Sequence, residues 1–211
     1  MDLQSMLSKL HPLRRESEVH PHAAVERADE FSAFDTGGPE LEFLEVLHCL
    51  VRAFKPKLVL ETGTGKGLST IALSGALQRN GSGHLWTLEN NAGAMQQAQS
   101  SLRSLEIDLT SFVSFVATDS LAYIEALQGG PFDFVFYDSL ISLRHREFHL
   151  MLERSLLSDQ ALCIFHDTSR NRGSTMHDYS QDTIDALDEA SYGHQWLECN
   201  LSRGLRLIKL G

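Results

Sequence analysis

The stretch that decides the fold is Leu58-Val59-Leu60-Glu61-Thr62-Gly63-Thr64-Gly65-Lys66-Gly67-Leu68-Ser69. It opens with a short apolar run, which is typical of a buried strand, and the small and apolar residues from 69 to 77 are typical of a helix. Between them glycine occupies every second position, where it lets the backbone turn sharply and approach a ligand. The free N–H groups at the start of the following helix favour a carboxylate or another anion. The stretch therefore predicts a strand, a ligand-binding glycine loop and a helix.

The rest of the chain repeats this alternation of strand and helix. Further strands are predicted at 84–89, 112–116, 132–137 and 161–165, and helices at 39–54, 92–105, 121–127, 144–157 and 183–190. Two last strands, at 194–199 and 205–209, are so close in sequence that they must pair antiparallel. We expect an α/β fold with one seven-stranded, mostly parallel sheet, helices on both faces and a C-terminal antiparallel hairpin.

Composition narrows the classes of partner. The chain has 28 acidic and 18 basic residues and a formal net charge of −10, so it lacks the broad positive surface that nucleic acids and anionic membranes require. No apolar run approaches the length of a membrane span. The three cysteines, Cys49, Cys163 and Cys199, are odd in number and have apolar neighbours, which favours buried reduced thiols in a cytoplasmic protein.

The chain divides into two parts by composition. Residues 1–34 are polar and rich in His, Arg and Glu, and we interpret them as a cap over the site or as an arm that forms a homodimer. Residues 35–211 carry all the strands and form the main domain, in which Pro39 is expected in the first turn of the first helix.

Three kinds of glycine loop compete for the stretch from 61 to 69. A phosphate-binding Walker loop needs glycine where Leu60 stands and Ser or Thr where Gly67 stands, so this interpretation fails. A dinucleotide loop would have Gly or Ala at Leu68, which weakens that interpretation. The pattern of an acid followed by three alternating glycines resembles motif I of class I S-adenosylmethionine-dependent methyltransferases. A purely structural turn is the alternative.

This resemblance implies a Rossmann-like methyltransferase domain over residues 35–211, with S-adenosylmethionine as the methyl donor. In such a domain Glu61 and the loop glycines Gly63, Gly65 and Gly67 face the methionine part of the donor. Glu89 ends the second strand 22 residues after Gly67, which is the offset at which an acidic side chain meets the two hydroxyls of a ribose.

Two acidic residues at the ends of later strands indicate a narrower family within the methyltransferases. Asp138 ends the fourth strand and Asp167 follows the fifth, so both are expected at the carboxyl edge of the sheet. This arrangement is similar to the catechol O-methyltransferase-like family, whose magnesium site has an Asp after strand four and an Asp-Asn pair after strand five. The resemblance implies Mg2+ ligands at Asp138, Asp167 and Thr168, where Thr168 stands in place of Asn. A site in which Asp138 contacts only substrate or donor, and Asp167 only caps a turn, is the alternative.

The same resemblance assigns the remaining contacts to the donor. Ser69 is implied beside its carboxylate, Asn90 beside its ribose, and Asp119 and Ser120 near its adenine. Asp138 and the turn 35–38 are implied near its methionine end. Asp119 is equally well explained as the N-cap of the next helix.

The catalytic base departs from the family pattern. The family has a lysine three residues after the strand-four Asp, and this chain has Ile141 there. We predict catalytic roles for Asp138 and for His166, since a neutral imidazole can accept a proton near neutral pH. His145 and His149 are weaker candidates, and each of the three is also explained as a structural histidine.

The sequence therefore predicts methyl transfer from S-adenosylmethionine to a hydroxyl of a small molecule, assisted by a divalent metal ion. A binding protein without catalysis and a small-molecule N-methyltransferase are the alternatives, and the lack of a Tyr-x-x-x-Lys pair argues against a short-chain NAD enzyme. An apolar wall for the acceptor is expected from Phe31, Phe34, Leu140, Ile141 and Leu143.

Overall fold

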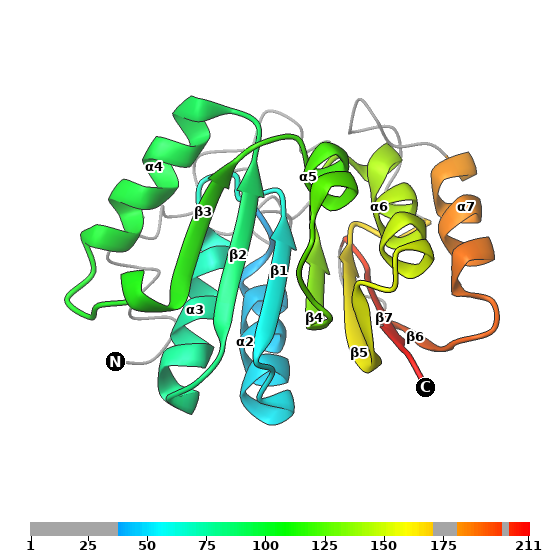
Figure 1. Ribbon diagram of the computed structural model, residues 1–211, viewed down its shortest axis with the longest axis horizontal. Coiled ribbons are helices and arrows are strands. Elements are labelled where there is room, and N and C mark those ends of the chain that lie inside the picture. The colour runs from blue at the N-terminus through cyan, green and yellow to red at the C-terminus, as the bar shows by residue number, and fades with distance from the viewer. Residues whose placement is uncertain (1–37, 171–180, 200–202) are drawn as a thin grey trace, which may run out of the picture.

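The computed structural model describes residues 38–170, 181–199 and 203–211, so the predicted cap or arm at 1–34 lies outside the described residues. The elements follow one another as α2 (Leu41–Phe54), β1 (Leu58–Thr62), α3 (Leu68–Asn80), β2 (His84–Glu89), α4 (Ala92–Arg103), η3 (Thr110–Phe112), β3 (Val113–Ala117), α5 (Ser120–Ala126), β4 (Phe132–Tyr137), α6 (Ile141–Glu153), β5 (Leu157–His166), α7 (Gln181–Ser191), β6 (Gln195–Cys199) and β7 (Leu205–Lys209) (Figure 1).

All seven strands form one sheet in the order β3-β2-β1-β4-β5-β7-β6. Strands β1 to β5 are parallel, whereas β7 runs antiparallel to both β5 and β6. The predicted fold class, including the antiparallel hairpin at the end of the chain, is confirmed. The order reverses between β1 and β4, and in parallel sheets a crevice for ligands opens at such a point.

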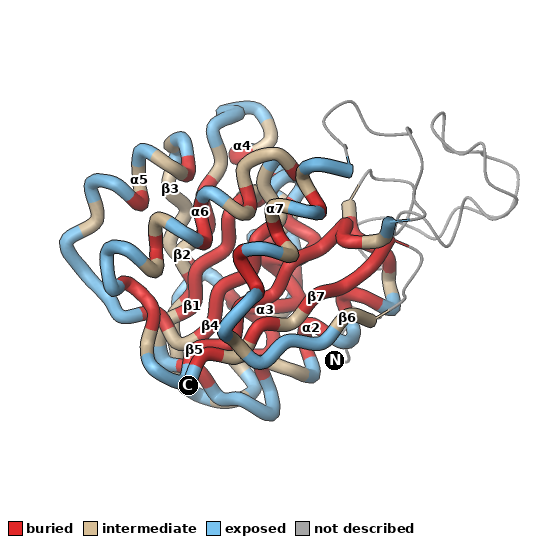
Figure 2. Tube along the Cα trace, turned by 90° about the vertical axis from the view of Figure 1, so that its right-hand side faces the viewer, coloured by how far each residue is buried: buried red, intermediate tan, exposed pale blue. Residues whose placement is uncertain are grey.

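Helices cover both faces of the sheet, as Figure 1 shows. Helices α2, α3 and the end of α4 pack on one face against Val59, Phe134 and Phe136, while α5, α6 and α7 pack on the other against Leu60 and Val135. Successive residues of a strand point to opposite faces, which explains why the apolar strands are buried on both sides. Figure 2 shows the result: a buried sheet between helices whose outer sides are exposed.

This alternation also decides where the last two residues of β1 point. Glu61 shares a face with Val59, toward α3, and Thr62 shares a face with Leu60, toward α6. The last two residues of β1 therefore place one polar side chain on each face of the sheet, immediately before the glycine loop in sequence.

Several predicted boundaries are wrong by a few residues. Helix α2 begins at Leu41 with Glu40 as its N-cap, so Pro39 lies before the helix rather than in its first turn. Helix α6 begins at Ile141, three residues earlier than predicted. Strand β5 begins at Leu157, because an irregular first part that includes exposed Asp159 and Gln160 still pairs with β4.

Two further sequence expectations can be compared with the fold. Cys163 is buried, as expected, but Cys49 is exposed because it lies on the outer side of α2. Within the described ranges, no helix is both long and apolar enough to cross a membrane.

Candidate active site

A cavity of about 620 Å3 opens at the carboxyl ends of the parallel strands. Its size is within the range of small-molecule sites. Most of the predicted site residues line it: Gly63, Gly65, Ser69, Glu89, Asn90, Asp119, Ser120, Asp138 and Asp167. Glu61, Gly67, His166 and Thr168 are not among its lining residues. The sequence therefore located the cavity, but not every side chain assigned to it faces the open space.

The three loop glycines have different tasks. All three have positive φ, but a Cβ on Gly63 would lie 2.4 Å from the carbonyl oxygen of Asp138, and one on Gly67 would lie 2.9 Å from the Cβ of Ala98. Both glycines are thus required by packing within the protein. A Cβ on Gly65 would meet nothing within 4 Å, so packing within the protein does not require this glycine, and the space beside it in the cavity wall is open.

Glu61 is fully buried behind the loop. One oxygen, Oε2, accepts hydrogen bonds from the hydroxyls of Thr70 and Thr87, both at 2.6 Å, while the other, Oε1, has no hydrogen-bond partner. Burial raises the pKa of Glu61 to about 7, although the surrounding hydroxyls act in the opposite direction. An unpartnered buried carboxyl oxygen is costly, and a cationic group or a water in the cavity would relieve that cost.

Glu89 stands at the end of β2 and is held by the loop it faces. Its two oxygens accept the backbone N–H groups of Gly65 at 2.8 Å and Asn91 at 2.9 Å. The side chain of Asn91 in turn caps α4 through the N–H groups of Gly93 and Ala94. These contacts fix the carboxylate at the cavity wall, where its remaining lone pairs can accept hydrogen bonds from hydroxyl groups.

The pair Asp119-Ser120 has structural partners in addition to its place in the cavity wall. Asp119 is the N-cap of α5 and accepts the N–H of Ala122 at 3.0 Å. The hydroxyl of Ser120 donates to the buried carboxylate of Glu147, which also accepts the hydroxyl of Thr62 at 2.9 Å. The N-cap interpretation of Asp119 is therefore confirmed, and a contact with an adenine remains compatible with it.

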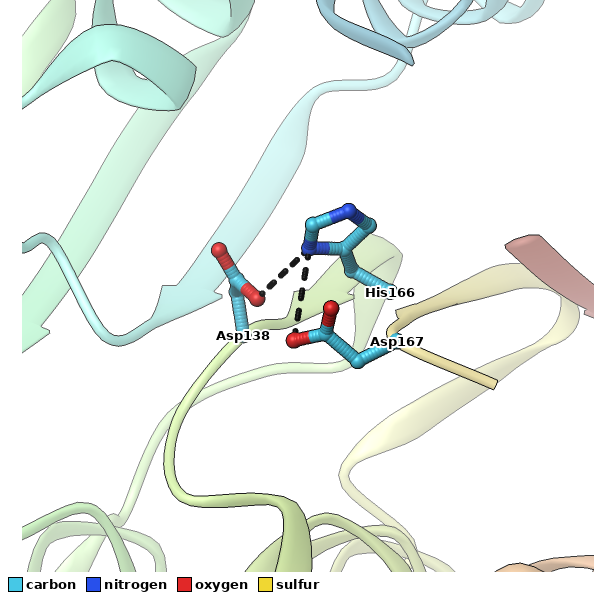
Figure 3. Close-up of side chains that lie close together, drawn as sticks. All are labelled: Asp138, His166 and Asp167. Carbon is cyan, nitrogen blue, oxygen red and sulfur yellow. Dashed lines mark hydrogen bonds and ion pairs between the residues drawn. The ribbon is translucent and has the colours of Figure 1, made fainter. Parts of the chain in front are cut away.

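At the other end of the cavity, Asp138, His166 and Asp167 lie close together (Figure 3). One donor atom from each lies within 4.8 Å of the others, and among the described residues this is the group that could hold a metal ion. His166 is 1% exposed and lies between two carboxylates, with Nδ1 3.2 Å from Asp138 and Nε2 2.6 Å from Glu40. Burial alone would lower the pKa of His166, but the charges of Asp167 and Asp138 outweigh it and raise the pKa.

Two arginines bind the same carboxylates. The guanidinium group of Arg144, on α6, lies 3.0 Å from Asp138 Oδ1 and 3.2 Å from Asp167 Oδ2. The Nε of Arg203 lies 2.7 Å from Asp167 Oδ1. The hydroxyl of Thr168 donates to Glu198 and takes no part in this cluster. Asp138 Oδ1 and both carboxylate oxygens of Asp167 thus already have arginine partners, and a metal ion bound to these oxygens would compete with the guanidinium groups.

Comparison with known proteins identifies the family to which the chain belongs. A family model described as a methyltransferase domain matches residues 60–168, about half of the chain. The chain belongs to this family of methyltransferase domains. The match runs from β1 to the residue after Asp167, and so contains the glycine loop, Glu89 and the carboxylate cluster.

Individual relatives are distant from this methyltransferase domain. The O-methyltransferase ankF of Aspergillus thermomutatus is 28% identical over 114 residues, which are 54% of this chain and 46% of the relative, so the chain matches about half the length of that protein. The O-methyltransferase TomG of Streptomyces achromogenes, solved in complex with SAM, superposes with a TM-score of 0.69 at 21% identity, over 97% of this chain and 89% of its own. An O-methyltransferase of Bacillus cereus, solved with SAH, gives 0.64 at 21% identity over the whole of both chains. At these identities the superpositions support the fold.

The sequence analysis missed four charged residues of the methyltransferase site. Arg144 and Glu147 carry a signal that could have found them, since they fall on the face of α6 that also presents the buried residues Ile141, Phe148 and Met151. Charged residues on an apolar face are expected to have buried partners. Glu40 and Arg203 carry no such signal, because their partners lie far away in the sequence.

The glycine loop predicts a contrast between two substitutions. Gly63→Ala should lower the free energy of unfolding by about 3 kcal/mol or more, because its Cβ would overlap the backbone of Asp138. Gly65→Ala should cost only about 1 kcal/mol, since it has a left-handed backbone but open space around it. Urea unfolding measures both, and equal losses would contradict the assignment of separate tasks.

Glu61 predicts a pH dependence of stability. Its pKa is about 7 in the folded protein against 4.5 for an ordinary glutamate, so the folded state binds the proton more tightly. The resulting stabilisation is fully present below pH 4.5 and is lost as pH rises through about 7, on the order of 3 kcal/mol. Between about pH 5 and about pH 8, the free energy of unfolding measured with urea should therefore decrease less for Glu61→Gln than for the wild type, because glutamine cannot ionise. An equal decrease in the free energy of unfolding of the two proteins would exclude Glu61 as the cause of the pH dependence.

Proposed function

We propose that this domain transfers the methyl group of S-adenosylmethionine to a hydroxyl group of a small molecule. The observation that carries the proposal is the open space beside Gly65, set between the unpartnered oxygen of Glu61 and the fixed carboxylate of Glu89. An adenosyl amino acid has an ammonium group, a carboxylate and a ribose with two hydroxyls. The cavity wall offers partners for the carboxylate and the ribose, and Glu61, buried behind the loop, offers an unpartnered oxygen for the ammonium group.

The amino-acid end of the donor belongs at the glycine loop. The N-terminus of α3 offers free backbone N–H groups beside Ser69, which suits a carboxylate. Glu61 suits the ammonium group, directly or through one water, because its Oε1 lacks a partner. The ribose belongs at Glu89 with Asn90 beside it, and the adenine near Asp119 and Ser120.

The acceptor belongs at the other end of the cavity, beside Asp138. When bound, S-adenosylmethionine supplies an electrophilic methyl group, so the protein has to orient the acceptor oxygen in line with it and to exclude water. Asp138 lines the cavity, and its Oδ1 is held by Arg144 and His166, which leaves the carboxylate fixed in direction. We infer that Asp138 accepts the hydrogen bond of the acceptor hydroxyl and takes its proton as the new O–C bond forms.

His166 is better placed to position Asp138 than to act as the base itself. Both ring nitrogens face carboxylates, the ring is buried, and the residue is not among those that line the cavity. His145 and His149 do not line it either. In the proposed methyl transfer, Asp138 is therefore the residue that contacts the acceptor hydroxyl.

The cavity wall beside Asp138 favours an acceptor with an apolar ring. Leu140, Ile141 and Leu143 line the cavity there, as expected from the sequence, and Leu140 remains 59% exposed. Binding of an apolar group against this exposed leucine would remove apolar surface from water, which is favourable. We infer from this wall that the acceptor is a phenol or another hydroxylated ring compound.

The homodimer expected through residues 1–34 stays a prediction, because those residues lie outside the described part of the chain.

The proposal predicts that the purified protein binds S-adenosylmethionine and its demethylated product, S-adenosylhomocysteine, with one site in calorimetry. Glu89→Ala should weaken binding by about tenfold or more, because a hydroxyl-binding carboxylate and the anchor of the loop are both lost. Glu45→Ala, on the exposed side of α2, is the matched control and should bind as the wild type does.

The reaction itself is tested by formation of S-adenosylhomocysteine with a panel of catechols, other phenols, sugar hydroxyls and small amines. Turnover confined to hydroxyl acceptors and abolished by Asp138→Ala is the expected result. Turnover confined to amines would favour N-methylation, and tight donor binding without turnover on any acceptor would favour a non-catalytic binding protein.

A further inference from the structure

The space between Asp138 and Asp167 is filled by a side chain of the protein itself. Nη2 of Arg144 contacts one oxygen of each carboxylate, at 3.0 and 3.2 Å, and the side chain is only 5% exposed. The same guanidinium group is held from two further directions, because Nε donates to the carbonyl of Ser139 at 2.8 Å and Nη1 donates to the carbonyl of His166. Arg144 is therefore fixed by bonds from all three of its nitrogens.

A divalent cation that bridged the two carboxylates through the oxygens that Arg144 binds, Asp138 Oδ1 and Asp167 Oδ2, would need the position that Nη2 holds. Such cations bind carboxylate oxygens at about 2.0–2.6 Å, closer than the two contacts of Nη2. A cation that bridged Asp138 Oδ1 and Asp167 Oδ2 would consequently displace Nη2, and the buried positive charge of Arg144 would be left beside it.

Two arginines already offset most of the negative charge of the cluster without a metal ion. Arg144 and Arg203 offset the charges of Asp138 and Asp167, and Arg203 is also held by the carbonyl of Gly38 at 2.7 Å. The third carboxylate, Glu40, accepts the backbone N–H of Arg203 at 2.8 Å and contacts the His166 ring. Two further positive charges would leave this buried set with a net positive charge, whether or not His166 is protonated, and an uncompensated buried charge costs free energy.

We propose that Arg144 takes the place of a divalent cation between Asp138 and Asp167, so that methyl transfer by this domain needs no metal ion. The guanidinium group is a positioning residue: it fixes the direction of Asp138 and keeps a positive charge at the end of the cavity where the acceptor oxygen belongs. The role in catalysis rests on the proposed function, whereas the displacement of the metal ion can be tested without any methyl donor.

The test is a titration of Mn2+ followed by electron paramagnetic resonance, in which bound Mn2+ loses the sharp signal of the free ion. Wild type should leave the signal unchanged. Arg144→Ala removes the built-in charge and uncovers both carboxylates, so it should gain one Mn2+ site, with affinity about tenfold or more above that of the wild type. Arg146→Ala, an exposed arginine on the same helix, should behave as the wild type.

Four results would overturn the proposal: a tight Mn2+ site in the wild type, no gain of a site in folded Arg144→Ala, a gain in Arg146→Ala, or wild-type turnover that a chelator abolishes. If circular dichroism shows that Arg144→Ala does not fold, the wild-type titration decides alone, since absence of binding up to millimolar Mn2+ supports the proposal and micromolar binding contradicts it. Failure of the proposed function would be recognised separately, by a protein that binds neither Mn2+ nor S-adenosylmethionine.

Discussion

The site depends on how closely the end of β1 approaches the end of β4. The N–H of Asp138 donates to the carbonyl of Thr62 at 2.9 Å, and the carbonyl of Asp138 lies where a Cβ on Gly63 would stand. The reversal of strand order falls between these two strands, so the crevice of the sheet opens at this contact. The absence of a side chain at Gly63 thereby allows the glycine loop to lie directly against the backbone of Asp138. No side chain larger than a hydrogen atom is compatible with that arrangement.

Around this contact the protein buries several charged groups, and each is held by named partners. Glu61 lies on one face of β1 with two threonine hydroxyls, and Glu147 lies on the other with Thr62 and Ser120. Burial raises the pKa of both carboxyls. Farther along the sheet edge, the carboxylates are paired with arginine instead. Because buried charges without partners are costly, these networks fix a rigid set of directions on which precise alignment of two substrates depends.

The strained backbone at the cluster is consistent with this view. Asp167 has a φ of 62°, a left-handed conformation that residues other than glycine rarely adopt. Its side chain is 1% exposed and is bound by two arginines, which compensates the strain. The position is therefore determined by the surrounding charges rather than by local preference.

Local patterns were sufficient for the fold and for most of the residues that line one end of the cavity. The glycine loop, Glu89 and the antiparallel ending all come from short contiguous stretches of sequence, and the structure places the loop and Glu89 in the cavity wall and the hairpin at the end of the sheet. The other end was predicted less completely. Asp138 and Asp167 were located, but Arg144 and Arg203 were not. Arg144 could have been found from its place on the buried face of α6, whereas Arg203 binds Asp167, 36 residues away, and Glu40, 163 residues away, and only the folded chain brings these together. The expectation of a metal ion came from the family resemblance and from the two carboxylates, without the arginines that the structure places on them.

The central claim is that the crevice between β1 and β4 holds an adenosyl amino acid. A crystal structure of the protein with S-adenosylhomocysteine tests it most directly. The account predicts the homocysteine part over Gly65 beside Ser69, the ribose hydroxyls on Glu89, and the sulfur directed toward Asp138. A ligand bound elsewhere, or bound in the crevice with its ends reversed, would contradict it.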